Sequence, residues 1–139
     1  YMIVYVVEGV SGLEKIILPI KGYGLWSTLY GFVALESDLN TVAGLGFYEH
    51  AETPGLGGEV DNPTWKAQWI GKKSYDSNRK QALTVIKGKV DSSRPQSVHE
   101  IDGLSGATIT SKGVDNLIKF WMGENGFAPF LTNLRSGEA

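Results

Sequence analysis

The order of apolar and polar residues predicts an antiparallel hairpin at the start of the chain. Residues 1–7 and 13–20 are rich in β-branched and aromatic side chains, and residues 8–12 between them contain two glycines and a serine. Two such runs joined by a short turn-forming segment are typical of paired strands. The glycines of residues 21–24 then predict a break in the second strand.

A second hairpin is expected from residues 30–36 and 41–49. Asp38 and Asn40 lie between the two runs, and both residue types favour tight turns. Residues 81–90 read as a further strand, although Gly88 interrupts their apolar pattern.

Two later segments predict helices. Asp61, Asn62 and Pro63 form a helix-start signal, in which a side-chain cap is followed by proline at the first helical position. Trp65 and Trp69 then lie one helical turn apart, on one face of a short helix that ends near Gly71; packing of this pair against a sheet is the expected role.

The second predicted helix follows Thr110. Its apolar residues recur with helical spacing, and Met122-Gly123 ends it; residues 128–134 predict one or two more helical turns. Together these patterns predict one α+β domain over residues 1–139, a mostly antiparallel sheet with two or three packed helices. The apolar positions of the second helix are Val114, Leu117, Ile118 and Trp121.

Composition narrows the chemistry that this domain can perform. The 139 residues include no cysteine, which excludes iron–sulfur clusters, thiolate zinc sites and disulfides. His50 and His99 are the two histidines, too few for a multi-histidine metal site, so no metal is expected. The net charge is −2 and no cluster of Lys or Arg stands out, so neither nucleic acid nor an anionic membrane surface is an expected direct partner. Any redox chemistry must therefore use an organic cofactor.

Residues 102–110 carry the most informative pattern in the chain. Three small residues at 105–107 are followed by Thr108, just before the predicted helix. The free amide groups and the positive dipole end of a helix N-terminus bind phosphate readily, and small residues let a bulky anion approach the backbone. The alternative is that Thr110 or Ser111 merely caps the helix.

The first seven of these residues resemble a known motif. Residues 102–108 match the D-G-x-S/T-G-A-T flavinylation motif of FMN-binding domains. Residues 21–26, 30–32 and 49–57 resemble the C-subunit family of bacterial sodium-translocating NADH:quinone oxidoreductases, and the likeness extends over nearly the whole chain. The G subunit of the related Rnf electron-transport complex is similar but matches less closely. The matching motif is Asp102-Gly103-Leu104-Ser105-Gly106-Ala107-Thr108.

This resemblance implies FMN joined covalently to Thr108 through a phosphodiester bond. It further implies that a flavin transferase, with FAD as donor, reads the segment that begins at Asp102 and Gly103. Thr110 would also bind the cofactor, beside the phosphate. The residues that would line the phosphate are Ser105, Gly106 and Ala107.

A glycine-rich loop is the expected site of the isoalloxazine ring. A flavin ring takes apolar or aromatic faces and backbone donors at its polar edge, and glycine lets that backbone come close. Trp26 would flank the ring, with a core aromatic as the alternative, and Lys87 would help to neutralise the phosphate unless it is a solvated strand lysine. The role of Glu52 stays open. The loop residues that would edge or cover the ring are Thr53, Gly55, Leu56 and Gly57.

The resemblance implies a one-electron carrier subunit of the sodium-pumping complex, with no catalytic residues of its own. Its partners would be the other subunits and, during maturation, the flavin transferase. Family members have an N-terminal membrane helix in the bacterial inner membrane, with the flavin domain on the periplasmic side. Residues 1–7 are far shorter than the roughly 20 residues that span a bilayer, so we expect the anchor to lie upstream of residue 1.

Other functions remain open from the sequence. One is a flavin domain of an Rnf-type or other envelope electron-transfer protein, with FMN bound covalently or noncovalently. Another is a purely structural domain. A hydrolytic triad of His99, Asp102 and Ser105 is disfavoured, because triads are usually assembled from distant parts of a chain.

Overall fold

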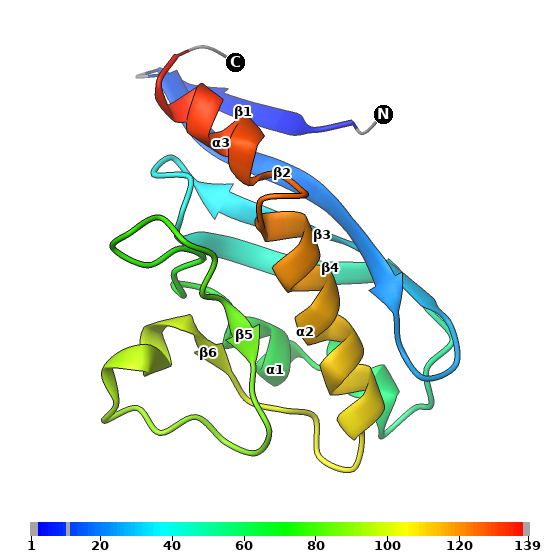
Figure 1. Ribbon diagram of the computed structural model, residues 1–139. Helices are drawn as coiled ribbons and strands as arrows, with labels where there is room; N and C mark the ends of the chain where they lie inside the picture. The colour runs from blue at the N-terminus through cyan, green and yellow to red at the C-terminus, as the bar shows by residue number, and fades with distance from the viewer. Residues whose placement is uncertain (1–2, 11, 138–139) are drawn as a thin grey trace.

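A four-stranded antiparallel sheet forms the centre of the computed structural model, which describes residues 3–10 and 12–137 (Figure 1). The strands lie in the order β1-β2-β3-β4, so both predicted hairpins are confirmed where they fall on described residues. Asp38 closes the second hairpin, since its Oδ1 accepts the amides of Asn40 at 2.9 Å and Thr41 at 2.8 Å. The bounds are β1 Tyr5–Gly9, β2 Gly12–Tyr23, β3 Thr28–Glu36 and β4 Val42–Glu49.

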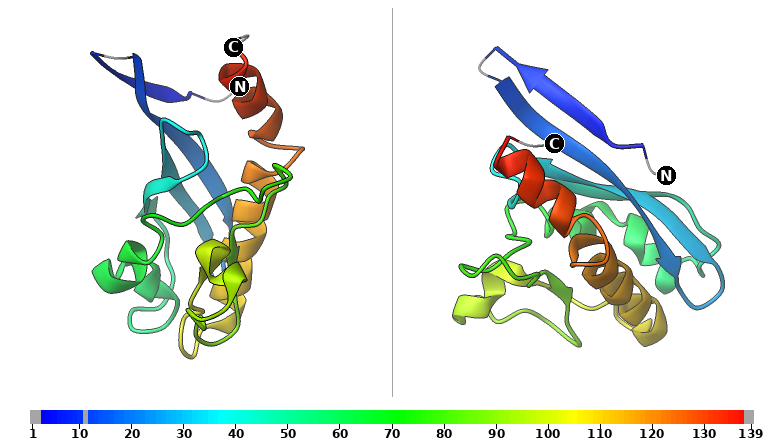
Figure 2. Two further views of the ribbon diagram at one scale, coloured as in Figure 1. Left: turned by 90° about the vertical axis from the view of Figure 1, so that its left-hand side faces the viewer. Right: turned by 45° about the horizontal axis from the view of Figure 1, so that its top comes forward.

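Helices cover one face of this sheet. Figure 2 shows α2 and α3 on the same side of the strands, with α1 and a small parallel pair, β5 and β6, beyond β4. The predicted α+β fold with a mostly antiparallel sheet and packed helices is confirmed. Among the described helices, none is both long enough and apolar enough to cross a bilayer. The remaining bounds are η1 Gly57–Asp61, α1 Pro63–Ala67, β5 Thr84–Val85, η2 Pro95–His99, β6 Glu100–Ile101, α2 Thr108–Met122 and α3 Ala128–Arg135.

The core lies between α2 and the sheet. Alternation along β2 turns Ile16, Leu18 and Ile20 toward the helix, and all three are buried. From the helix side, Val114 and Ile118 are fully buried, as their spacing predicts. The apolar stripe of α2 therefore decides which face of the sheet is covered.

The predicted break at residues 21–24 is wrong, because β2 continues to Tyr23. Gly22 is needed for close packing instead of a turn: a Cβ at this position would lie 2.5 Å from Cβ of Leu117 on α2. The neighbouring sequence alone cannot distinguish a glycine needed for close packing between elements from a glycine that ends a strand.

The strand predicted over residues 81–90 is also wrong beyond Thr84–Val85. Gly88 adopts a positive φ of 81°, which is incompatible with a continuing strand. The amide of Val90 then donates to Oδ1 of Asp102 at 2.8 Å and makes no strand pairing.

Helix α1 begins as predicted. Oδ1 of Asn62 accepts the amide of Thr64 at 2.8 Å, and Pro63 is the first helical residue. Trp65 and Trp69 are buried with their rings edge to face, 5.6 Å between centroids, which confirms their packing role. The indole Nε1 of Trp65 donates to the carbonyl of Asp102 at 2.8 Å and so anchors the segment that precedes α2.

Candidate functional site

Three segments that are distant in sequence meet at the N-terminal end of α2. They are the β2–β3 loop at residues 24–27, the loop at residues 52–58 and the turn at residues 102–107. Figure 1 shows the loop after β4 and the start of α2 at the same end of the sheet. The hydrogen bonds of one buried carboxylate join two of these segments to the helix.

That carboxylate belongs to Glu52, which is 5 % exposed. Oε1 accepts the amide of Leu25 at 2.7 Å and the hydroxyl of Thr110 at 2.7 Å. Oε2 accepts the amide of Trp26 at 2.9 Å and the hydroxyl of Ser27 at 3.0 Å. One side chain therefore binds the β2–β3 loop and the first turn of α2 at the same time.

Glycines allow these segments to approach so closely. A Cβ on Gly24 would lie 2.4 Å from Oε1 of Glu52, and a Cβ on Gly57 would lie 2.5 Å from Oγ1 of Thr110. Neither distance is tolerated between real atoms. Of the glycines expected to line a flavin, Gly57 is thus required by protein packing. Gly55 has open space around it and adopts a positive φ of 81°.

The ionisation of Glu52 is controlled by its surroundings. Burial opposes the charged form, but the hydrogen bonds from Thr110, Leu25, Trp26 and Ser27 outweigh it and hold the pKa of Glu52 below its ordinary value of 4.5. A folded-state pKa below the unfolded value means that this carboxylate stabilises the fold above pH 4.5. That contribution is lost as the pH falls through the folded-state pKa.

We expect the amide protons of Leu25 and Trp26 to report this titration. Their NMR chemical shifts should move together with a midpoint below pH 4.5, because protonation removes the charge that they donate to. A midpoint at or above pH 4.5, or separate midpoints for the two amides, would contradict the lowered pKa of Glu52 or its hydrogen bonds to both amides.

Thr108 is the first residue of α2 and is exposed. The helix therefore begins three residues earlier than expected, with Ala107 at the N-cap, and no side chain among the described residues caps it. The interpretation of Thr110 or Ser111 as the cap is wrong. Amide groups of the first turn are left for solvent or a ligand.

The hydroxyls near Thr108 differ in accessibility. Thr110 is 2 % exposed and bonded to Glu52, and Ser111 is buried with its Oγ accepting the amide of Leu104 at 2.8 Å. Ser105 is exposed like Thr108, but it lines a different hollow. Accessibility thus leaves Ser105 and Thr108 as the reactive candidates within the motif.

Thr108 opens into a hollow of about 180 Å³ that also contains Lys87 and Lys112. Both lysines are exposed, and neither forms an ion pair within the described part of the chain. Asp115 lines the same hollow, but its carboxylate is occupied by Lys119 at 2.8 Å and by the amide of Val85 at 2.9 Å. The hollow therefore presents positive charge beside the Thr108 hydroxyl.

Lys112 is a residue that sequence reasoning missed. The available signal was its spacing, because residues 108 and 112 share one face of a helix. Lys87 lies in a loop after β5 and not in a strand, and it is exposed, as expected of a solvated lysine. Its role toward a phosphate stays a prediction.

A second hollow of about 240 Å³ lies on the other side of the turn. Gly55, Gly103 and Ser105 line it. Asp102 also lines it, but its carboxylate is held internally: Oδ2 accepts Nε2 of Gln68 at 3.1 Å and Oδ1 accepts the amide of Val90. Asp102 thus fixes the turn, and recognition by a transferase stays a prediction for this residue.

Two of the predicted ring-contact residues have exposed apolar surface. Trp26 is 67 % exposed, so the alternative of a core aromatic is wrong, and Leu56 is 47 % exposed. Thr53 is exposed too, and its carbonyl accepts two amides of the loop. Gly106 adopts φ +71°, and a Cβ there would lie 3.2 Å from Cδ2 of Leu56. The loop and the motif are therefore in contact range.

The alternative chemistries find no supporting geometry. The ring of His99 pairs with the carbonyl of Lys73 at 2.7 Å, away from Ser105 and Asp102. The Nε2 of His50 pairs with Asp61 at 2.7 Å. Across residues 3–10 and 12–137, no group of three or more acidic or histidine side chains is arranged to hold a metal ion.

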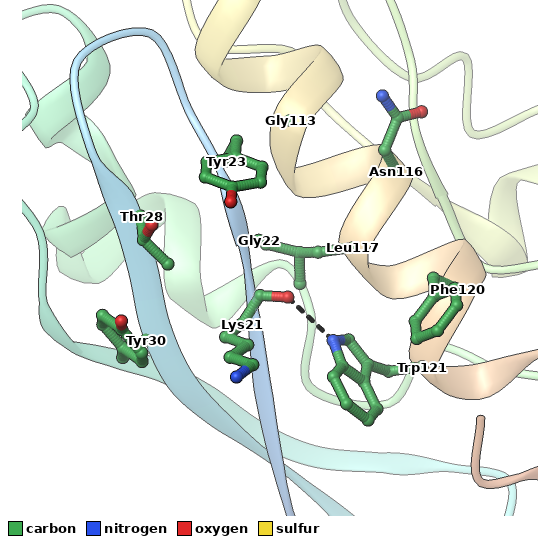
Figure 3. Close-up of a pocket in the computed structure, with 10 residues that line it drawn as sticks. All are labelled: Lys21, Gly22, Tyr23, Thr28, Tyr30, Gly113, Asn116, Leu117, Phe120 and Trp121. Carbon is green, nitrogen blue, oxygen red and sulfur yellow. Dashed lines mark hydrogen bonds between the residues drawn. The ribbon is translucent and has the colours of Figure 1, made fainter.

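A larger hollow of about 500 Å³ lies between β2 and α2 (Figure 3). Aromatic side chains of Tyr23, Tyr30, Phe120 and Trp121 surround it, and Nε1 of Trp121 donates to the carbonyl of Lys21 at 2.7 Å. None of the predicted site residues lines it. Size alone therefore does not identify the functional site.

The residues around Thr108 fit a phosphate-linked aromatic cofactor. Gly106, with its positive φ, leaves room beside Leu56. Lys87 and Lys112 supply positive charge, and the backbone amides in the first turn of α2 are free to donate to a phosphate. Apolar surface on Trp26 and Leu56 suits an aromatic ring.

Comparison with known proteins agrees with this geometry. Residues 24–123 match the family described as FMN-binding domain. The chain is 63 % identical over all 139 residues to the C subunit of the Na(+)-translocating NADH-quinone reductase of Pseudomonas aeruginosa, of which it covers 53 %. It is 53 % identical to the same subunit of Vibrio parahaemolyticus, covering 97 % of this chain and 51 % of that one. The chain thus spans about half the length of these curated relatives.

Two solved structures are similar as well. The crystal structure of NqrC from Shewanella oneidensis superposes with a TM-score of 0.86 at 42 % identity, over 96 % of this chain and 60 % of that one. The C subunit of the Na(+)-translocating NADH-quinone reductase from Parabacteroides distasonis gives a TM-score of 0.78 at 37 % identity, over 93 % of this chain and 62 % of that one.

Proposed function

The chain belongs to the FMN-binding domain family, and we propose that it carries FMN covalently on Thr108 as a one-electron carrier of a sodium-translocating NADH:quinone reductase. The observation that carries the proposal is the position of Thr108. It ends a segment that resembles a flavinylation motif, lies exposed at the first residue of α2, and lines a hollow with two lysines that form no ion pair among the described residues.

The residues of the site have distinct tasks in this proposal. During maturation, the Thr108 hydroxyl would lose its proton and bond to the phosphorus of the FMN half of FAD, while the pyrophosphate bond breaks and AMP leaves. Lys87 and Lys112 offset the negative charge of the phosphodiester, and Gly106 and Ala107 keep the approach free of bulk. When bound, FMN supplies the uptake and release of single electrons.

The wider setting follows from the relatives. They are named as the C subunit of a sodium-translocating reductase, so the other subunits of such a complex are the proposed electron donor and acceptor. The chain would act as a subunit of that enzyme, without catalysis of its own. A flavin transferase is the proposed partner during maturation. We place the domain on the periplasmic side of the bacterial inner membrane, tethered through an N-terminal helix of the whole protein.

Co-expression with a flavin transferase tests the proposal. The purified chain should retain a flavin absorption spectrum after denaturation and filtration, and stepwise reduction should proceed through one-electron stages. A colour that is lost on denaturation would indicate noncovalent binding. A chain that stays colourless beside an active transferase would contradict the function altogether.

Replacing Leu56 or Trp26 by Ala should leave FMN attached but shift its reduction potential. Both side chains have exposed apolar surface, whereas attachment depends on Thr108. Spectroelectrochemical titration of the loaded variants measures the effect. Val10→Ala, at an exposed apolar residue outside the three segments of the site, is the control. Potentials and spectra equal to the parent's in both site variants would contradict this placement of the ring.

A further inference from the structure

The hydrogen bonds of Glu52 are divided evenly between its two oxygens. Each oxygen accepts one backbone amide and one hydroxyl: Leu25 and Thr110 on Oε1, Trp26 and Ser27 on Oε2. The amides come from the β2–β3 loop, and Thr110 comes from α2. A single carboxylate in the residue 52–58 loop thus accepts hydrogen bonds from donors in two separate elements.

The charge of Glu52 has no cationic partner. Within the described residues, no Lys, Arg or His nitrogen lies within 4 Å of its carboxylate. Burying a charge costs free energy even when neutral donors surround it, and apolar packing would serve stability at lower cost. This buried charge is bonded to Thr110, two residues after the exposed Thr108, and its position therefore points to a role in the site.

We infer that Glu52 is a positioning residue of the flavin site, which holds the Trp26 backbone and the residue 53–57 loop against the first turn of α2 and places a negative charge there. This inference rests on the proposed function. Trp26 and Leu56 project outward from the two segments that Glu52 joins. Their relative placement depends on bonds to one carboxylate.

Glu52→Gln is the most informative variant. Glutamine has the same shape, but each oxygen of Glu52 faces a backbone amide, so the amide NH₂ always meets a donor that cannot rotate away. In the flavin-free chain, hydrogen exchange of the Leu25 and Trp26 amides should accelerate about tenfold. Exchange at Ile118, in the core half of α2, should stay unchanged.

Glu49→Gln is the matched control, because it removes the same charge from an exposed residue three positions away. Ser27→Ala is a milder second variant, which removes one donor to Glu52 and keeps its charge. It should show a smaller acceleration at the same two amides. It keeps the inference testable if Glu52→Gln does not fold.

In the flavin-loaded protein, Glu52→Gln should raise the flavin reduction potential relative to the parent, since removal of a nearby negative charge favours electron uptake. Glu49→Gln should leave it close to the parent value. A merely structural role for Glu52 would change exchange but not the potential, and that result would overturn the inference.

Failure of the inference is distinguishable from failure of the proposed function. A parent chain that takes up no FMN beside an active transferase overturns the proposed function and, with it, the role of Glu52 toward a flavin. A parent that loads FMN, combined with Glu52→Gln exchange and potential equal to those of Glu49→Gln, overturns the inference alone.

Discussion

Replacing Thr108 by Val is expected to abolish covalent attachment of FMN while the fold is retained. Valine keeps the β-branched shape and removes the oxygen that must bond to phosphorus. Because Thr108 is exposed and caps nothing, the free energy of unfolding should change by less than about 0.5 kcal/mol. Intact mass after co-expression with the transferase measures attachment, and thermal unfolding measures stability.

Two variants control for neighbouring hydroxyls. Ser105→Ala removes the other exposed hydroxyl of the motif and should leave attachment intact. Thr108→Ser retains a hydroxyl and is expected to be modified in part. FMN mass on Thr108→Val protein would show that the acceptor is assigned to the wrong residue.

Replacing Gly113 by Ala is expected to destabilise the fold and to disturb the site. A Cβ at this position would lie 2.1 Å from the carbonyl oxygen of Tyr23 and 3.1 Å from Cα of Gly24. Overpacking costs about 3 kcal/mol at such a contact, while alanine gains about 1 kcal/mol of helix propensity over glycine. The steric cost prevails, so the net loss should be about 2 kcal/mol.

Denaturant unfolding of the flavin-free chain measures this loss. The variant should also loosen the β2–β3 loop, because α2 must move away from Tyr23 and Gly24. Gly44→Ala is the control, since no atom lies within 4 Å of a Cβ built there. Equal stability of the Gly113 and Gly44 variants would mean that α2 does not pack on this loop as described.

Local patterns were sufficient for the elements that depend on local physics. The hairpin turn at Asp38 and the cap at Asn62 both form because their side chains bond to amides two or three residues away. The apolar stripe of α2 was predictable from its spacing. Trp121 is the partial exception, because it is only half-buried and its indole donates to Lys21.

Errors arose where tertiary contact overrides local signals. Gly22 reads as a strand breaker, yet it is required by Leu117, which is 95 residues away. Likewise, nothing adjacent to Glu52 indicates that its donors lie in residues 25–27 and at Thr110. A carboxylate in a glycine-rich loop is a visible signal, but its partners become evident only once the fold has joined the segments.

The motif at residues 102–108 predicts more of the proposed site than the physical pattern of its residues does. Thr108, Ser105 and Gly106 stay predictions from that motif, and their surroundings fit a phosphate. The internal role of Asp102 was not predictable, because it depends on Gln68 and Val90. Lys112 needed only the correct start of α2.

Peptide mass mapping of the chain after co-expression with a flavin transferase tests the central claim most directly. Trypsin cleavage after Lys89 and Lys112 releases a peptide that contains the whole motif. Fragmentation of this peptide should place the mass of FMN less one water on Thr108. The same mass on Ser105 or Thr110, or an unmodified peptide from protein made beside a transferase that is active on another substrate, would contradict the assignment.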